Sequence, residues 1–194
     1  VMTEKHTFIP GNTNVYNKDY SSYSLEDVCL EMSSLGKGDI REPFIEVTYP
    51  NGSSTTDMVF DRAEIIKGKE EYDTLPGSYD DNGEVEQLVI YLKDRNYNLT
   101  LELHYYVYEK CDIITRSAKL VNSGNESVRL ERLMSMQLDL NESDYELSFF
   151  NGAWAREMNR SRIPIRAGKY VNESVTGTSS NRANPFFMIG RSST

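Results

Sequence analysis

Hydrophobic and polar residues alternate along the middle of the chain, from Glu86 to Leu140. A period of two is typical of strands that bury one face of a sheet. Between Tyr97 and Glu109 the odd positions are apolar, while Thr100, Glu102 and His104 point the other way. The apolar row consists of Leu99, Leu101, Leu103, Tyr105 and Val107. This pattern predicts a long strand with one buried face.

Two further strands are predicted after it. Ile113 to Val121 ends at the turn-forming cluster Asn122 to Asn125. From Val128 to Leu140 apolar residues again take alternate positions, except at Arg132 and Leu133, where a bulge is expected. The simplest arrangement is an antiparallel β-meander.

Shorter elements precede the meander. The polar segment before Tyr23 has no period, and Ser24 is a suitable N-cap for a short helical turn. Phe44 to Tyr49 predicts a strand, and Pro50 to Ser53 predicts a hairpin turn into a second strand at Asp57 to Ile66.

The chain after Leu140 has a different character. Strands are predicted at Tyr145 to Phe150 and at Pro185 to Gly190, whereas Asn151 to Arg166 has no period and predicts a loop. We therefore expect an all-β protein with at most short helical turns. Its 194 residues suit a single β-sandwich domain spanning residues 1–194.

Composition disfavours several kinds of partner. The chain has 30 acidic and 21 basic residues, a net charge of −9, and no basic cluster of the kind that nucleic-acid binding requires. No apolar run reaches the length of a membrane span. Cys29 and Cys111 lie far apart outside any CxxC motif, so no metal is expected, and a reduced, cytoplasmic protein is favoured over a disulfide. Without a GxGxxG or P-loop motif, no cofactor is expected.

Catalytic candidates are few. The two histidines, His6 and His104, belong to no metal-binding or nucleophile pattern, and His104 is expected to be a packed or solvated strand residue. Any two carboxylates could in principle form the acid/base pair of a glycosidase. Most of them lie on predicted turns and hairpins, however, where a charge is usually a solvated surface group. Composition and spacing alone indicate a soluble β-sandwich domain.

Trp154 is the only tryptophan, and it lies in a segment rich in glycine and arginine. An indole ring can stack on the apolar C–H face of a sugar, and its N–H can donate to a hydroxyl. Arg156 and Glu157 supply polar groups of the kind found in small-ligand sites. The alternative is that Trp154 plugs one end of the sandwich as a core residue.

Five segments resemble the N-terminal domain of the glycoside hydrolase family 36 α-galactosidases, in the same order and at similar spacing. They are Ser24 to Glu26 (SLE), Gly38 to Pro43 (GDIREP), Asp112 to Ser117 (DIITRS), Gly152 to Glu157 (GAWARE) and Gly177 to Phe186 (GTSSNRANPF). Each segment alone is a weak signal. Their combination along the whole chain is specific.

The resemblance implies an antiparallel β-supersandwich of the galactose-mutarotase type. In the family this domain precedes a (β/α)₈ barrel, which carries the two catalytic Asp residues of a retaining mechanism. Neither Asp has a counterpart here, so the chain is expected to be inactive alone. For the full-length enzyme the resemblance implies hydrolysis of α-galactosides, with galactose and raffinose-type oligosaccharides as ligands, and a homo-oligomer.

The resemblance also implies roles for residues of the GAWARE segment. The tryptophan of this loop reaches the galactose pocket in the family, so Trp154 is expected to contact substrate. Gly152, Arg156 and Glu157 are expected to support the loop, with an Arg156–Glu157 ion pair as a purely structural alternative.

Other charged residues are expected to be scaffold or departures from the family pattern. Asp39 and Arg41 are expected to form a structural pair, and Arg116 another, because a buried charge needs a partner. Lys5 stands where the family often has Asp near the pocket, and Asn181 where it usually has His. These two departures affect the expected fine specificity and local pH dependence.

Three functions from different classes follow. The first is an accessory domain of an α-galactosidase that shapes the substrate pocket. The second is a stand-alone carbohydrate-binding module, which would bind sugar in isolation. The third is a mutarotase-like enzyme, which needs histidine and carboxylate groups converging on one face, and the scarcity of histidine argues against it.

Overall fold

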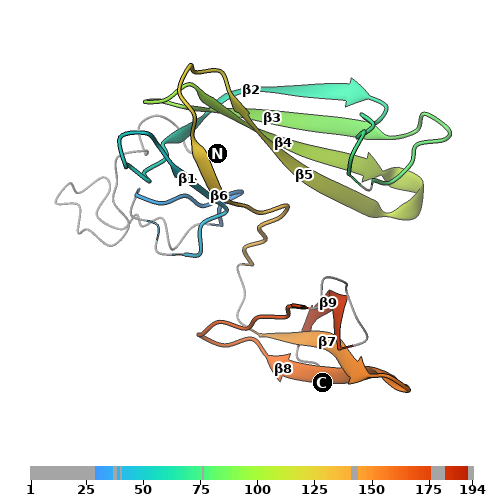
Figure 1. The fold of residues 1–194 in the computed structure, drawn as a ribbon. Coiled ribbons are helices and arrows are strands. Elements are labelled where there is room, and N and C mark those ends of the chain that lie inside the picture. The colour runs from blue at the N-terminus through green and yellow to red at the C-terminus, as the bar shows by residue number, and fades with distance from the viewer. Residues whose placement is uncertain are drawn as a thin grey trace, which may run out of the picture. The chain divides into compact units, whose positions relative to one another are not determined.

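The computed structural model describes residues 29–36, 39, 41–75, 77–140, 144–175 and 182–191. Within these residues lie nine strands and one 3-10 turn, η3 (Glu109–Cys111) (Figure 1). The strands are β1 (Ile45–Thr48), β2 (Met58–Lys67), β3 (Glu86–Asp94), β4 (Leu99–Tyr108), β5 (Ile113–Asn122), β6 (Arg129–Leu133), β7 (Tyr145–Ala153), β8 (Arg156–Pro164) and β9 (Ala183–Arg191). All pairings between them are antiparallel, so the predicted all-β antiparallel class is confirmed.

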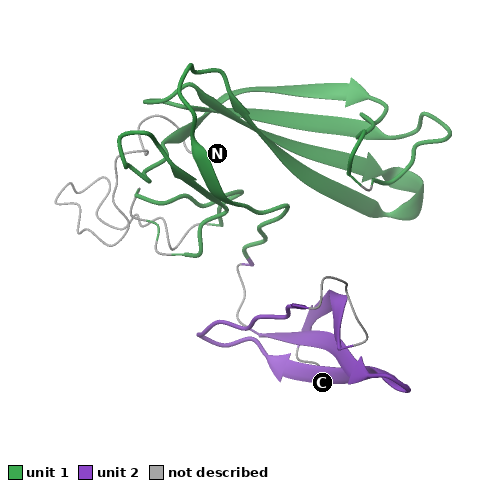
Figure 2. Cartoon of the chain, viewed as in Figure 1, with its two compact units in different colours: residues 1–139 green, residues 140–194 purple. Residues whose placement is uncertain are grey.

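The chain divides into two compact units, residues 1–139 and residues 140–194 (Figure 2). The first contains β1 to β6 and the second β7 to β9. Each unit is described by itself below. The single sandwich domain spanning residues 1–194 stays a prediction.

The largest sheet of the first unit has the strand order β2-β3-β4-β5. Consecutive strands are neighbours throughout it, so the meander is confirmed for β3, β4 and β5. Its predicted continuation over Val128 to Leu140 is wrong, because only Arg129 to Leu133 forms a strand, and that strand pairs with β1. A bulge does occur beside Arg132, since Glu46 pairs with Arg132 and Val47 already pairs with Leu130.

The predicted hairpin between Phe44 and Ile66 is also wrong. The turn itself forms, with the backbone N–H of Gly52 donating to the carbonyl of Tyr49 at 2.9 Å. The strands on either side of the turn, however, enter different sheets. Phe44, Ile45 and Val47 are fully buried, and a strand that packs across the face of a sheet buries such residues better than one added at its edge.

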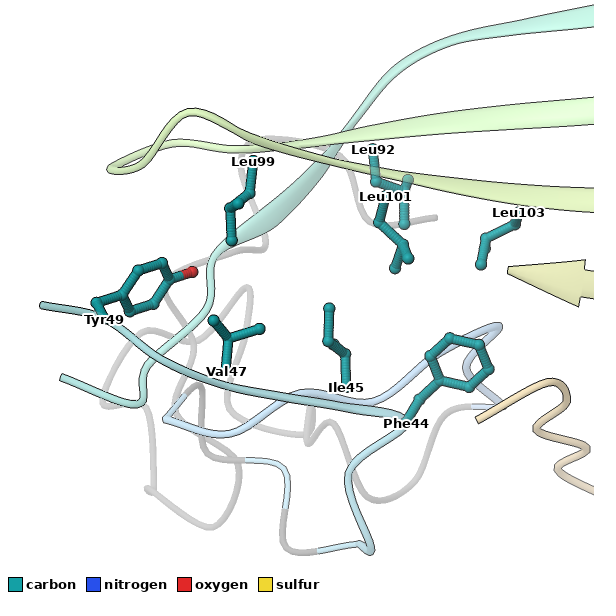
Figure 3. Packing of buried hydrophobic residues seen from close by; sticks show 8 residues of the cluster. All are labelled: Phe44, Ile45, Val47, Tyr49, Leu92, Leu99, Leu101 and Leu103. Carbon is teal, nitrogen blue, oxygen red and sulfur yellow. The ribbon is translucent and has the colours of Figure 1, made fainter. Parts of the chain in front are cut away.

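The core of the first unit lies between the β1–β6 ribbon and one face of the four-stranded sheet. Figure 3 shows side chains from the β1 segment pointing toward leucines of β3 and β4. The cluster consists of Phe44, Ile45, Val47, Tyr49, Leu92, Leu99, Leu101 and Leu103. The apolar row read from the sequence therefore forms the core as far as Leu103. Beyond Leu103 this face of β4 is covered less completely, and Val107 is exposed.

The opposite face of β4 is not solvated where the alternation predicts it to be. His104 and Tyr106 are both buried, at 3% and 1% exposure. The Tyr72 hydroxyl lies 2.5 Å from that of Tyr106 and 2.6 Å from Ser117 Oγ, so the segment after β2 covers this part of the sheet. His104 is thus a packed residue, and both faces of β4 are buried around Leu103 and His104.

The second unit has the strand order β8-β7-β9. The prediction of a loop over Asn151 to Arg166 is wrong, because these residues complete a β7–β8 hairpin. Most residues of β8 are exposed. Within this unit, therefore, neither face of the strand packs against a core that would require alternating apolar residues. Backbone pairing alone defines such a strand, and the sequence carries no period to reveal it.

Two groups of expectations remain. One concerns residues outside the described ranges, and the other concerns features that the sequence predicts to be absent. The helical turn after Ser24 and the departures Lys5 and Asn181 lie outside the described residues. Within the described part of the chain no helix is long and apolar enough to cross a membrane. Cys29 and Cys111, which are both described and exposed, form no disulfide with each other.

Two buried tyrosines and one partly buried tyrosine predict a loss of stability at alkaline pH. Burial raises the pKa of Tyr49, Tyr105 and Tyr106 above the ordinary value, and neighbouring carboxylates such as Asp94 add to the shift at Tyr49. The folded-state pKa values exceed the unfolded value of about 10, so the unfolded chain binds fewer protons there. Stability is therefore complete below about pH 10 and falls above it.

Urea unfolding between about pH 8 and about pH 11 measures this loss. Tyr49→Phe is expected to flatten the pH dependence, whereas Tyr79→Phe, at a residue 82% exposed, leaves it unchanged. A free energy of unfolding that stays constant across this range contradicts the prediction.

Candidate functional site

Trp154 lies at the tip of the β7–β8 hairpin. Ala153 pairs with Arg156, so Trp154 and Ala155 form a two-residue connection between the strands. Ala155 has a φ of 58°, and short hairpin turns commonly require such a left-handed residue. Trp154 is 87% exposed. Within the second unit Trp154 is therefore not a core residue.

The hairpin tip is fixed by local hydrogen bonds. The backbone N–H of Ala155 donates to Glu157 Oε1 at 2.8 Å, which closes the turn. Asn159 Nδ2 donates to the carbonyl of Arg156 at 2.8 Å. Met158, with a φ of 58°, is the extra residue of a bulge in β8. The turn and the bulge together define how the indole is presented.

The three predicted supporting residues take different positions. Gly152 lies in β7 opposite the bulge and is half-buried. Glu157 accepts the hydrogen bond that closes the turn. The supporting role of Arg156, and the alternative of a purely structural ion pair with Glu157, stay predictions. Arg156 is exposed beside Trp154 at the start of β8.

Asp39 and Arg41 belong to a charged cluster in the first unit. Arg41 Nε donates to Asp39 Oδ1 at 2.8 Å, and Arg41 Nη1 donates to Asp139 Oδ2 at 2.5 Å. The side chain of Asp39 is only 2% exposed. Burial lowers the pKa of Arg41, but the hydrogen bond and charge of Asp39, with the charge of Asp139, raise it by more. The guanidinium therefore stays charged and links segments far apart in the sequence.

Arg116 forms a second such link. Its side chain is 9% exposed, and it donates to the backbone carbonyls of Gln137 and Glu31 at 2.9 and 3.0 Å. Its Nη2 also lies 2.8 Å from Glu31 Oε1. These contacts attach the segments before β1 and after β6 to the sheet.

Sequence reasoning missed a polar group on the sheet face opposite the core. His104 lies 3.2 Å from Glu102 Oε2 and 2.9 Å from Gln87 Nε2, beside a cavity of about 540 Å³. Histidine and carboxylate do converge here, contrary to the argument from the scarcity of histidine. The available signal was the row of polar residues at a period of two on β4, namely Thr100, Glu102 and His104. No three His, Cys, Asp or Glu side chains within the described residues are grouped to hold a metal ion.

The sequence as a whole identifies the family. Residues 2–194 match the model of the glycosyl hydrolase family 36 N-terminal domain. The chain belongs to this family. The family 36 resemblance of the five segments is thereby confirmed.

Curated relatives from the family are α-galactosidases. AgaA of Geobacillus stearothermophilus is 37% identical over 169 residues, which cover 87% of this chain and 23% of that protein. The bifunctional α-galactosidase/sucrose kinase AgaSK of Mediterraneibacter gnavus is 31% identical over 194 residues, which cover 100% of this chain and 21% of that protein. The family 36 domain thus spans less than a quarter of the length of these two relatives.

Solved structures of the family share the fold. The α-galactosidase of Lactobacillus brevis superposes with a TM-score of 0.86 at 37% identity, over 91% of this chain and 24% of that one. AgaA of G. stearothermophilus in complex with raffinose gives a TM-score of 0.84 at 35% identity, over 93% of this chain and 25% of that one. The predicted β-supersandwich class is therefore confirmed.

Proposed function

We propose that this chain is the non-catalytic N-terminal domain of an α-galactosidase, and that its β7–β8 hairpin forms part of the substrate pocket in the full-length enzyme. The observation that carries the proposal is the 87% exposure of Trp154 at the hairpin tip. Family membership supports the enzyme class, since the relatives are α-galactosidases.

The exposure of Trp154 favours a binding role. An indole buries more apolar surface than most side chains, so leaving it in water forgoes a large stabilisation. The short turn and the hydrogen bond to Glu157 hold the hairpin tip before any ligand arrives. The indole itself has few rotatable bonds, so fixing it against a ligand costs little conformational entropy. Sugar C–H faces are suitable partners for such a ring.

The hairpin offers little for bond cleavage. A retaining glycosidase needs two carboxyl groups about 5–5.5 Å apart. The residues of the hairpin tip include one carboxylate, Glu157, and its Oε1 already accepts from the backbone of Ala155. Cleavage is therefore assigned to polypeptide outside this chain. Related structures contain raffinose and stachyose, which supports α-galactosides as the substrate class.

Activity of the 194-residue chain alone tests the proposed division of roles. With a chromogenic α-galactoside we expect no turnover above that of a mock preparation. Turnover above the mock preparation contradicts the proposal.

Fluorescence of Trp154 separates this proposal from a stand-alone binding module. Because Trp154 is the only tryptophan, its emission reports on the hairpin alone. We expect no saturable change with millimolar raffinose, since most of the pocket lies outside this chain. A saturable change favours the stand-alone module instead.

A further inference from the structure

A cavity of about 540 Å³ lies on the face of the β2–β5 sheet that is turned away from the apolar core. Its floor is formed by residues of β3 and β4 that alternate with the core leucines, among them Gln87, Val89, Glu102 and His104. Lys69, from the segment after β2, and Lys119, from β5, are at its sides. All its lining residues belong to the first unit, whereas Trp154 belongs to the second.

His104 is held rigidly at the base of this cavity. It is 3% exposed, and both of its ring nitrogens have partners. An amide –NH₂ only donates, so Gln87 Nε2 donates to His104 Nδ1 at 2.9 Å. This assigns the ring proton to Nε2, which donates to Glu102 Oε2 at 3.2 Å. With both nitrogens engaged, His104 acts as a positioning residue for the carboxylate of Glu102.

Glu102 is the group that the arrangement presents to the cavity. Its Oε2 accepts from His104 and lies 3.5 Å from Lys119 Nζ. Its Oε1 makes no hydrogen bond within the described residues, although the side chain is only 15% exposed. Among the described residues, the buried polar atoms without a partner do not include this oxygen, so it keeps contact with solvent. It can therefore accept a hydrogen bond from a ligand in the cavity.

The lining indicates the chemical class of that ligand. The charged residues that line the cavity are nearly balanced in sign, so the cavity is suited to neither a polyanion nor a cation. They are three lysines and two glutamates: Lys67, Lys69, Lys119, Glu70 and Glu102. Carboxylate acceptors beside ammonium donors instead match neighbouring hydroxyl groups, because each hydroxyl both donates and accepts. Tyr91, which is half-buried, adds apolar surface for C–H groups.

We propose that this cavity is a second carbohydrate site, which binds a neutral polyhydroxylated ring such as a monosaccharide. Glu102 Oε1 accepts from one ring hydroxyl, and Lys119 Nζ donates to a hydroxyl beside it. Gln87 and His104 fix the carboxylate through the Glu102–His104 hydrogen bond. The site is independent of the proposed pocket role of Trp154.

The imidazole C–H resonances of the 194-residue chain test this site. The chain has two histidines, so His6→Gln assigns the His104 signal. D-galactose and D-glucose, each titrated into the millimolar range, are the probes. We expect at least one of them to shift the His104 resonance saturably, both in the unaltered chain and in Trp154→Ala. No shift with either sugar overturns the proposal.

Two variants identify the groups responsible. Glu102→Gln keeps the shape of the side chain but removes the charge, and it is expected to weaken sugar binding about tenfold. The matched control is Glu84→Gln, which removes an exposed carboxylate paired with Lys110 outside the cavity and leaves the affinity unchanged. If Glu102→Gln binds as tightly as the control, the site is not built on Glu102 and the proposal fails. Lys119→Met, which carries the second proposed contact, gives an independent measurement if Glu102→Gln does not fold.

Discussion

Replacing Trp154 with alanine is expected to lower kcat/KM of the full-length enzyme on raffinose by about 10- to 100-fold. This range corresponds to the loss of one aromatic anchor from a binding pocket. The side chain is 87% exposed, so its removal leaves no cavity in the fold. Steady-state kinetics measures the effect, and a thermal unfolding scan of the same variant is expected to show an unchanged Tm.

Two further variants interpret that result. Trp154→Phe keeps an aromatic face without the N–H donor and is expected to recover part of the activity. Val175→Ala removes an apolar side chain that is 88% exposed in the same unit and is expected to behave as the unaltered enzyme. Equal kcat/KM values for Trp154→Ala and Val175→Ala contradict a pocket role for Trp154.

The second large effect is expected from Arg41→Met, which should lower the free energy of unfolding by about 3 kcal/mol. The substitution leaves the carboxylate of Asp39, which is 2% exposed, without its guanidinium partner. It also breaks the 2.5 Å contact to Asp139, which joins the segment before β1 to the chain after β6. An unpaired buried charge is costly because it has lost its hydration. Urea denaturation of the 194-residue chain measures the change.

Arg129→Met is the matched control for this prediction. Arg129 also pairs with a carboxylate, Glu131 at 2.9 Å, but its side chain is 78% exposed. Its loss is expected to cost at most about 1 kcal/mol. Combining Arg41→Met with Asp39→Asn removes the buried charge and should recover part of the stability. A similar, small destabilisation by Arg41→Met and Arg129→Met is incompatible with a structural role for the cluster.

The sequence predicts the strands of this fold better than their pairing. Alternation identified β4 and the core leucines because one face of that strand packs on apolar side chains. It could not reveal that β6 leaves the predicted meander, and β1 the predicted hairpin, to pair with each other. A buried apolar row has the same pattern whether the strand lies at the edge of a sheet or packs across its face. It also missed β8, whose exposed residues carry no period.

The candidate site was predictable to a similar extent. Trp154 stood out as the only tryptophan, but its exposure depends on the hairpin that the sequence had suggested to be a loop. His104 was expected on a polar face, and it is buried because the segment around Tyr72 covers that face. The contact that covers this face joins residues 72 and 117, which are far apart in the sequence, so no local sequence pattern predicts it. The polar cavity therefore became visible only in the structure.

The most direct test is a crystal structure of the full-length α-galactosidase proposed above, in an inactivated form, with raffinose bound. The account predicts that the Trp154 indole lies within about 4 Å of the galactose ring or of the sugar next to it. A bound substrate with no sugar unit in contact with Trp154 would contradict it.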